Sequence, residues 1–228
     1  MTKVLQGAWI VIPAYRESQV LQSVVAQLLP FCPHIVVVDD GSKDATGAQA
    51  LAGGATVLTH AVNLGQGAAL KTGIDFALLR GASYIYTFDA DGQHDPASLA
   101  ILAETMRKKG ADVVLGSRWL GRVESMPAAR RIMLKMAVIF TRLHSGLGLT
   151  DTHNGLRLFT RDAASRIRIS QARMAHASEI LEQIAACRLR FAEAPVTVRY
   201  TEYSLRKGQR ISGMFKVLAD IFYARWTQ

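Results

Sequence analysis

Hydrophobic and polar residues in the first half of the chain follow two alternating patterns. Short runs rich in β-branched and aromatic residues, such as residues 35–38, are typical of buried strands. Between these runs, apolar residues recur at helical spacing, as at Leu21, Val24, Val25 and Leu28, which predicts helices with one buried face. The predicted strands are residues 8–12, 34–39, 55–60, 82–88 and 112–117, and the predicted helices are residues 17–29, 44–52, 67–80 and 96–109.

This alternation predicts an α/β fold with a mostly parallel sheet and helices on both of its faces. The alternation stops after Arg118. The later segments are predicted as strands at 155–160 and 191–200, and as helices at 127–147, 177–187 and 211–226. We expect a single domain over residues 1–228, with a functional boundary near residue 120.

Two carboxylates at the end of a predicted strand give the strongest chemical signal. Asp89 and Asp91 follow an apolar run that ends at Phe88. Side chains at positions i and i+2 of an extended segment point the same way, and open α/β sheets bind ligands beyond the carboxyl ends of their strands. Because hard divalent cations prefer oxygen ligands, the pair predicts a Mg²⁺ or Mn²⁺ site under a phosphorylated substrate. A helix cap is the alternative, although Gln93 and His94 add more polar groups than a cap needs.

Other polar turns also fall at the ends of predicted strands. Residues 13–17 follow the first strand, and residues 39–44 follow the second with carboxylates that could accept from a ribose hydroxyl or a base N–H. Residues 63–67 nearly match the dinucleotide fingerprint of dehydrogenases, but Leu70 stands where that fingerprint has a third small residue. Arg118, just past a predicted strand, is a candidate for a bidentate phosphate contact. Ordinary turns and a surface arginine are the alternatives.

Composition narrows the class of partner. The formal net charge is +9, from 27 basic and 18 acidic residues, which favours nucleoside diphosphates, lipid phosphates or an anionic membrane face. No aromatic-basic stacking pattern is present, so we expect no nucleic-acid partner. Cys32 and Cys187 are far apart and are expected to be reduced thiols of a cytoplasmic protein. The N-terminus lacks the pattern of a signal peptide.

One basic and apolar segment bears on membrane contact. Residues 132–149 are interrupted by Lys135, Arg142 and His144, so they are not expected to span a bilayer. Their long apolar side chains and cations would allow the helix to lie in a headgroup layer, and packing against the sheet is the alternative. We expect peripheral membrane contact, if any, through residues 130–149.

Five motifs in this order resemble the family 2 glycosyltransferases of GT-A fold, above all the dolichyl- and polyprenyl-phosphate sugar transferases. The motifs are residues 11–17, 39–44, 63–67, 89–96 and 116–118, and the resemblance extends over about residues 8–215. It implies a Rossmann-like GT-A sheet with a nucleotide-sugar half at 1–120 and an acceptor half at 121–228. It also implies an inverting, metal-dependent hexosyltransferase with a UDP- or GDP-sugar donor. The expected acceptor is a polyprenyl phosphate at the cytoplasmic face of a membrane.

The resemblance implies roles for residues of the first half. The nucleotide site is expected at Pro13, Tyr15, Glu17, Asp40, Lys71, Asp89 and Arg118, and the Mg²⁺ or Mn²⁺ site at Asp89, Asp91 and Gln93. The neighbouring turns favour Asp91 as the metal ligand and place Asp89 nearer the ribose. Arg16 departs from the family pattern, which usually has Asn there, and receives no role.

Residues 150–159 resemble the family's Asp-x-x-x-Gly-x-Arg segment, which makes Asp151 a candidate base or acceptor-positioning carboxylate. The other implied positions are Glu179 and Arg206 for catalysis, and Arg157, Lys207 and Arg210 for the acceptor or its phosphate. Residues 203–212, with the basic side chains of Arg206, Lys207 and Arg210, are expected to form a loop that closes over phosphate. Caps and solvated side chains remain the alternatives. A hydroxyl acceptor, a non-catalytic nucleotide-sugar-binding module and the choice between UDP and GDP stay open.

Overall fold

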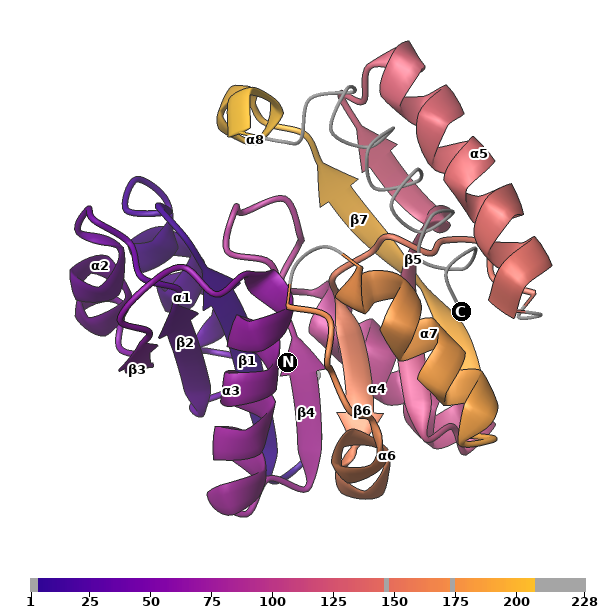
Figure 1. Cartoon of the computed structure of the whole chain (residues 1–228), viewed down its shortest axis with the longest axis horizontal. Helices are drawn as coiled ribbons and strands as arrows, with labels where there is room; N and C mark the ends of the chain where they lie inside the picture. Colours follow the sequence, from indigo (N-terminus) through magenta and orange to yellow (C-terminus); the bar gives the residue numbers. More distant parts are fainter. Residues whose placement is uncertain (1–3, 146–147, 173–174, 208–228) are drawn as a thin grey trace.

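A computed structural model of the chain describes residues 4–145, 148–172 and 175–207, with side chains throughout except at 140–145 and 205–207 (Figure 1). The strands are β1 (Ala8–Ala14), β2 (Ile35–Asp39), β3 (Thr56–Thr59), β4 (Tyr84–Thr87), β5 (Val113–Glu124), β6 (Arg157–Thr160) and β7 (Phe191–Arg199). The helices are α1 (Leu21–Leu28), α2 (Thr46–Ala52), α3 (Gln66–Leu79), α4 (Ser98–Lys109), α5 (Ala128–Ser145), α6 (Arg161–Arg166), α7 (His176–Ala186) and α8 (Glu202–Lys207). Every strand and helix predicted before residue 200 is present near its predicted position.

In the described part of the chain, the strands form one sheet in the order β3-β2-β1-β4-β6-β5-β7. Neighbouring strands are parallel except at β6, which runs antiparallel to both β4 and β5. The mostly parallel sheet predicted from the sequence is therefore confirmed. Because β1, β2 and β4 run in the same direction, the chain leaves all three at one edge of the sheet, after Ala14, Asp39 and Thr87.

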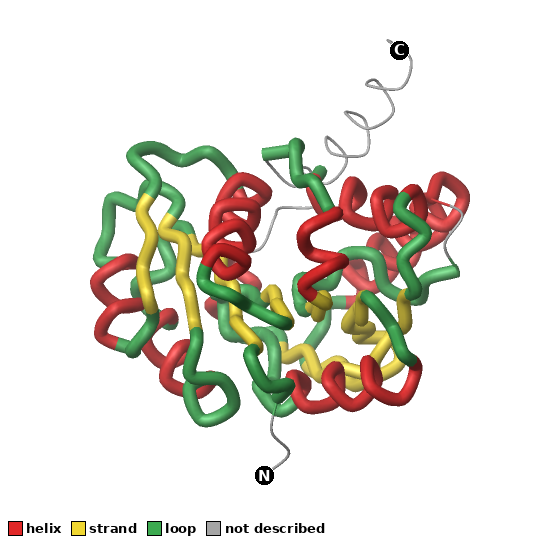
Figure 2. The backbone as a smooth tube through the Cα atoms, turned by 90° about the horizontal axis from the view of Figure 1, so that it is seen from below, coloured by secondary structure: helices red, strands yellow, loops and turns green. Residues whose placement is uncertain are grey.

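Alternate residues of the central strands face two separate apolar cores. Ile10 and Ile12 of β1 belong to the core formed with α1, α2 and α4, whereas Val11 belongs to the core formed with α3, α6 and α7. Val36 and Val37 of β2 divide between the two cores in the same way. Figure 2 shows the helices on both sides of the strands. Since both faces are covered, the carboxyl edge of the strands is where a ligand site is expected.

Some elements differ from their predicted bounds for local reasons. Helix α1 begins at Leu21 rather than at residue 17, because the preceding turn is bound to α2: the Glu17 N–H donates to Thr46 Oγ1 (2.9 Å). Strand β5 continues to Glu124, with a shift of register against β7 after Ser117.

Two short helices were not predicted. Helix α6 follows β6 directly, and the side chain of Thr160 caps it by accepting from the Ala163 N–H (3.2 Å). Helix α8 covers residues 202–207, so the loop predicted over 203–212 was wrong for its first part. Residues 208–212 and the helix predicted at 211–226 lie outside the described residues. None of the helices in the described ranges has both the length and the hydropathy that a bilayer span requires.

Candidate active site

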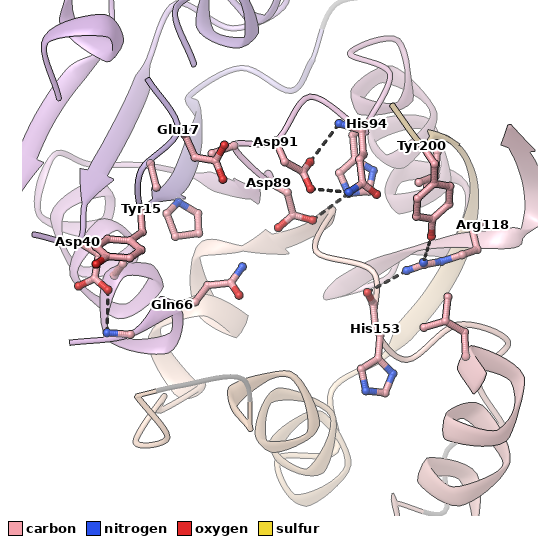
Figure 3. A pocket seen from close by; sticks show the side chains of 18 of the residues that line it. Tyr15, Glu17, Asp40, Gln66, Asp89, Asp91, His94, Arg118, His153 and Tyr200 are labelled. Carbon is pink, nitrogen blue, oxygen red and sulfur yellow. Dashed lines mark hydrogen bonds and ion pairs between the residues drawn. The ribbon is translucent and has the colours of Figure 1, made fainter. Parts of the chain in front are cut away.

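A cavity of about 680 Å³ opens at the carboxyl ends of β1, β2 and β4 (Figure 3). Its wall includes most of the residues predicted for the nucleotide and the metal: Pro13, Tyr15, Glu17, Asp40, Asp89, Asp91, Gln93 and Arg118. Figure 3 shows Tyr15 and Asp40 on one side of the cavity and Arg118 on the other, with Asp89 and Asp91 between them. Residues as far apart in sequence as Pro13 and Tyr200 therefore meet around one space.

The turns after β1 and β2 are bonded to each other. Arg16 has a left-handed backbone conformation (φ 57°), which is uncommon for a residue with a Cβ, and its N–H donates to Ser42 Oγ (2.9 Å). The Arg16 guanidinium lies over the Tyr15 ring, 5.2 Å from the ring centroid. The turn that carries Tyr15 and Glu17 into the cavity is thus fixed by its neighbours.

A long-range contact joins the two halves of the chain beside this turn. Tyr203 of α8 donates its hydroxyl to Glu17 Oε2 (2.7 Å). Burial and the negative charge of Glu17 raise the pKa of Tyr203 above its ordinary value, so the phenol keeps its proton. The predicted phosphate-binding side chains of Arg206, Lys207 and Arg210 lie outside the described residues, and their roles stay predictions.

Asp40 organises the turn that enters α3. Its Oδ1 accepts from the Leu64 N–H (2.9 Å) and its Oδ2 from the Gly65 N–H (2.7 Å). Gly65 has a φ of 105°, which favours glycine, and within the first turn of α3 the Gly67 N–H donates to the Ala172 carbonyl (2.7 Å). Because the N–H groups of Leu64, Gly65 and Gly67 already have partners within the chain, they are not available to cradle a phosphate as in a dinucleotide-binding enzyme.

The two carboxylates after β4 are held within their own loop. His94 Nε2 lies 3.1 Å from Asp89 Oδ2, and Gln93 donates its side-chain N–H to Asp91 Oδ2 (2.6 Å) and its backbone N–H to Oδ1 (3.1 Å). Burial raises the pKa of Asp91 to about 6, and the charge of Asp89 adds to this effect. Burial also acts on Asp89, but the hydrogen bond to His94 and the charges of His94 and Arg157 outweigh it and lower the pKa of Asp89. The partners of Asp89 therefore outweigh the effect of burial on its charge, whereas the bonds from Gln93 to Asp91 do not.

This donor set fits a hard divalent cation. Asp89 and Asp91 both line the cavity, and a cation would offset the cost of burying the Asp91 charge. In the described ranges, no group of three His, Cys, Asp or Glu side chains is arranged to hold a metal, so the other ligands would be waters and substrate oxygens, as Mg²⁺ accepts. Gly155 closes the back of this site, because a Cβ there would lie 2.3 Å from both carboxylate oxygens of Asp89.

Arg118 is bound by three groups on the opposite wall. Its Nε donates to Asp151 Oδ2 (2.6 Å), its Nη1 to the Tyr200 hydroxyl (2.8 Å) and its Nη2 to the His153 carbonyl (2.8 Å). Burial opposes the charge of Arg118, but Asp151 outweighs burial and raises the pKa of the guanidinium. A guanidinium has five N–H donors, so the described residues leave two of them for a ligand. Asp151 lies behind Arg118 and outside the cavity wall, and its Oδ1 accepts from the His153 N–H (3.2 Å).

Other predicted residues also lie outside the cavity wall. Arg157 is 3% exposed on β6, and burial lowers its pKa to about 10 although two carboxylates oppose that shift. The Glu179 carboxylate accepts backbone N–H groups of the 170–172 loop at 3.0–3.1 Å. The Ala172 carbonyl of this loop accepts the Gly67 N–H at the start of α3. Glu179 is therefore connected to the cavity only through the loop and α3. Lys71 pairs with a carboxylate one turn away on the exposed face of α3.

The sequence did not single out several cavity residues: Gln66, Ala69, Arg130, Leu134, His153, Val198 and Tyr200. Gln66 lies inside the 63–67 motif, so the motif itself could have indicated it. Arg130 and Tyr200 come together only in the folded chain, where the Arg130 guanidinium lies 5.0 Å from the Tyr200 ring centroid. No sequence signal pointed to that pair.

A second cavity of about 380 Å³ shares Arg118 with the first. Its wall comprises Arg118, Trp119, Gly121, Val123, Ser125, Met126 and Arg131. Among the described residues, the buried Trp119 indole N–H has no hydrogen-bond partner, and the charged groups of Arg131 and Lys135 lie over the ring, 5.9 and 5.8 Å from its centroid. A buried donor beside several cations is suited to an anionic ligand group.

Comparisons with known proteins agree with this geometry. The profile of the family described as Glycosyl transferase family 2 matches residues 9–168, and the chain belongs to this family. It is a glycosyltransferase. The chain is 37% identical over 175 residues to polyprenol monophosphomannose synthase of Mycolicibacterium smegmatis, covering 72% of this chain and 66% of that protein. It is 30% identical over 231 residues to UDP-N-acetylglucosamine–dolichyl-phosphate N-acetylglucosaminyltransferase of Methanococcus voltae, covering 92% of each chain.

Solved structures share the fold. Glucosyl-3-phosphoglycerate synthase from Mycobacterium tuberculosis, in complex with Mn²⁺ and UDP-glucose, matches with a TM-score of 0.68 at 19% identity. The match covers 91% of this chain and 73% of that one. The GT-A fold and the family predicted from the five motifs are therefore confirmed.

Proposed function

We propose that this glycosyltransferase moves a sugar, with inversion, from a UDP- or GDP-sugar to a polyprenyl phosphate. One observation carries the proposal: Asp89 and Asp91 lie in the cavity between Tyr15 and Arg118, and Arg118 also borders a second cavity beside Arg131. Relatives named as polyprenyl- and dolichyl-phosphate sugar transferases support it, as does the Mn²⁺ and UDP-glucose bound by a structural neighbour. We assign the donor to residues 1–120 and the acceptor to residues 121–228.

The donor would lie across the large cavity. Tyr15, Glu17 and Asp40 would contact the nucleoside, and Asp91 with Asp89 would hold Mg²⁺ or Mn²⁺ beside the diphosphate. Such a cation stabilises the negative charge that builds on a leaving diphosphate. The two N–H groups that Arg118 keeps available would bind a phosphate oxygen.

The acceptor would supply its own nucleophile. A phosphate oxygen of the acceptor attacks the anomeric carbon, the bond from that carbon to the diphosphate oxygen breaks, and the diphosphate leaves with the electron pair. A phosphate is already anionic at neutral pH, so this step requires no general base. A reaction without a general base is consistent with the position of Asp151, because its carboxylate binds Arg118 and does not face the cavity.

The acceptor phosphate would occupy the second cavity, beside Arg131 and the Trp119 N–H, for which the described part of the chain supplies no partner. Helix α5 borders this cavity and exposes Ile132, Met136 and Ile139 by 60–64%, at the spacing of one helical stripe. Apolar side chains between cations are suited to the headgroup layer of an anionic membrane. We propose that α5 contacts the cytoplasmic face of a membrane there, within the predicted segment 130–149.

A donor and acceptor screen tests this function. The purified chain would be incubated with UDP- and GDP-sugars, with Mn²⁺, Mg²⁺ or EDTA, and with or without a polyprenyl phosphate. We expect cation-dependent nucleotide release together with glycolipid formation, and NMR of the product should show the inverted anomer. Asp91→Ala should lower transfer by about 10²-fold or more, whereas Asp75→Ala, a matched carboxylate on the exposed face of α3, should not. Nucleotide release that is unchanged in Asp91→Ala refutes the proposal, and transfer only to hydroxyl acceptors refutes its acceptor.

A further inference from the structure

His60, directly after β3, joins Asp40 of the cavity wall to helix α3. Its Nδ1 lies 2.7 Å from Asp40 Oδ1, and its Nε2 lies 3.0 Å from Thr72 Oγ1. The side chains of His60 and Asp40 are 11% and 3% exposed, so water competes little for these bonds. Because a carboxylate only accepts hydrogen bonds, the proton on this side of the imidazole belongs to Nδ1.

The contact matters because of what Asp40 itself holds. The Asp40 carboxylate also accepts the Leu64 and Gly65 N–H groups, so three donors converge on its two oxygens. The turn that these groups fix packs closely on the end of β2: a Cβ at Gly41 would lie 2.5 Å from the Val62 carbonyl carbon. Two residues of this turn, Asn63 and Gly65, form part of the cavity wall.

Thr72 supplies the second anchor. It lies on α3, whose first turn contributes Gln66 and Ala69 to the same wall. The chain of contacts from Asp40 through His60 to Thr72 therefore ties a strand end, a turn and a helix together around one side of the cavity. Charge-assisted hydrogen bonds in a nearly dry setting are strong enough to fix such a geometry.

We propose that His60 is a positioning residue for the donor nucleotide. It does not line the cavity; it fixes the rotamer of Asp40 and the turn at 62–65 before the nucleotide arrives. The wall is then already ordered in the folded protein, so nucleotide binding does not carry the free-energy cost of ordering it, which strengthens nucleotide affinity. This inference rests on the proposed function, since it requires that the cavity bind a nucleoside diphosphate.

Three substitutions of one residue separate the two contacts. An Asn amide can reach the position of Nδ1, and a Gln amide can reach the position of Nε2. His60→Asn therefore keeps the Asp40 bond, His60→Gln keeps the Thr72 bond, and His60→Ala keeps neither. UDP and GDP binding would be measured by calorimetry with saturating Mn²⁺, and the donor KM and kcat would be measured alongside.

We expect His60→Ala and His60→Gln to weaken the Kd of the preferred nucleotide by about 10-fold or more, and His60→Asn by less than about 3-fold. The loss should appear in the donor KM rather than in kcat. Amide hydrogen exchange at Leu64 and Gly65, measured without ligand, should accelerate in the same two variants. A role in folding alone would lower the melting temperature and leave the Kd of the folded variants unchanged.

Unchanged nucleotide affinity and unchanged exchange in folded His60→Gln overturn the inference, and so does an equal loss in His60→Asn and His60→Ala. Thr72→Val tests the second anchor without altering His60, and we expect a smaller loss of affinity of the same kind. Failure here is distinct from failure of the proposed function. In the latter case the unaltered chain binds neither UDP nor GDP in the presence of Mn²⁺.

Discussion

Asp151→Asn removes the charge of a carboxylate that the sequence marks as a candidate base and that the fold places behind Arg118. The two side chains are 2% and 7% exposed, and Arg118 donates to Asp151 Oδ2 from both its backbone N–H (3.0 Å) and its Nε (2.6 Å). The substitution keeps the shape of the side chain but leaves the Arg118 guanidinium with only neutral partners, the Tyr200 hydroxyl and the His153 carbonyl.

The expected cost follows from the burial of the pair. Removing one partner of a buried ion pair costs about 3–5 kcal/mol, and the amide oxygen that remains favours the lower figure. For a chain of this size, about 3 kcal/mol corresponds to a fall in melting temperature of roughly 6–12 °C. Urea and thermal unfolding would measure both quantities.

A matched control is available at Asp112, whose partner Arg190 is 72% exposed. Asp112→Asn should cost less than about 1 kcal/mol, because exposed pairs contribute little. Transfer by Asp151→Asn, assayed well below its melting temperature, should fall mainly through a raised donor KM, since Arg118 loses its orienting partner. An unaltered melting temperature together with a fall in kcat of about 10³-fold or more would contradict this reasoning and restore Asp151 as a general base.

Three further outcomes are expected. Gly155→Ala should displace Asp89, whose oxygens would lie 2.3 Å from the new Cβ, so Mn²⁺ titration should show weaker binding in a variant that is still folded. Burial raises the pKa of Asp91 to about 6, so ionisation of Asp91 lowers the stability of the fold as the pH rises from the ordinary pKa of an aspartate to about 6. In EDTA, Asp91→Asn should therefore raise the free energy of unfolding at pH 7.5 by roughly 1–3 kcal/mol. Below about pH 4 the substitution should have no such effect. Ile132→Glu on α5 should reduce flotation with anionic vesicles, whereas Leu79→Glu, at an 86% exposed position on α3, should not.

The sequence indicated the first half of the site well because the relevant signals are local. Asp40, Asp89 and Asp91 each follow an apolar run, and a parallel sheet brings the ends of such runs to one edge whatever the details of packing. Even there, the partner of Asp40 went unnoticed. His60 looked like the end of a strand, and its bonds to Asp40 and Thr72 depend on the pairing of β2 with β3 and on the packing of α3.

The second half was harder because its contacts are long-range. Asp151 and Arg118 were both selected, but their 33-residue separation gave no sign that they pair with each other. Glu179 was selected as catalytic from the resemblance, while the fold turns its carboxylate toward the loop at 170–172. The bond from Tyr203 to Glu17 spans 186 residues and has no local signature.

The antiparallel direction of β6 determines which part of the chain can reach the carboxylates of Asp89 and Asp91. A parallel strand delivers to this edge of the sheet only the residues that follow it, but β6 delivers the residues that precede it, including Asp151 and Gly155. The segment that backs Asp89 is therefore the same segment that leads from α5, the helix with the exposed apolar stripe. The proposed membrane contact at α5 and the proposed cation site at Asp89 are therefore joined by a single segment of the chain, between Ser145 and Gly155.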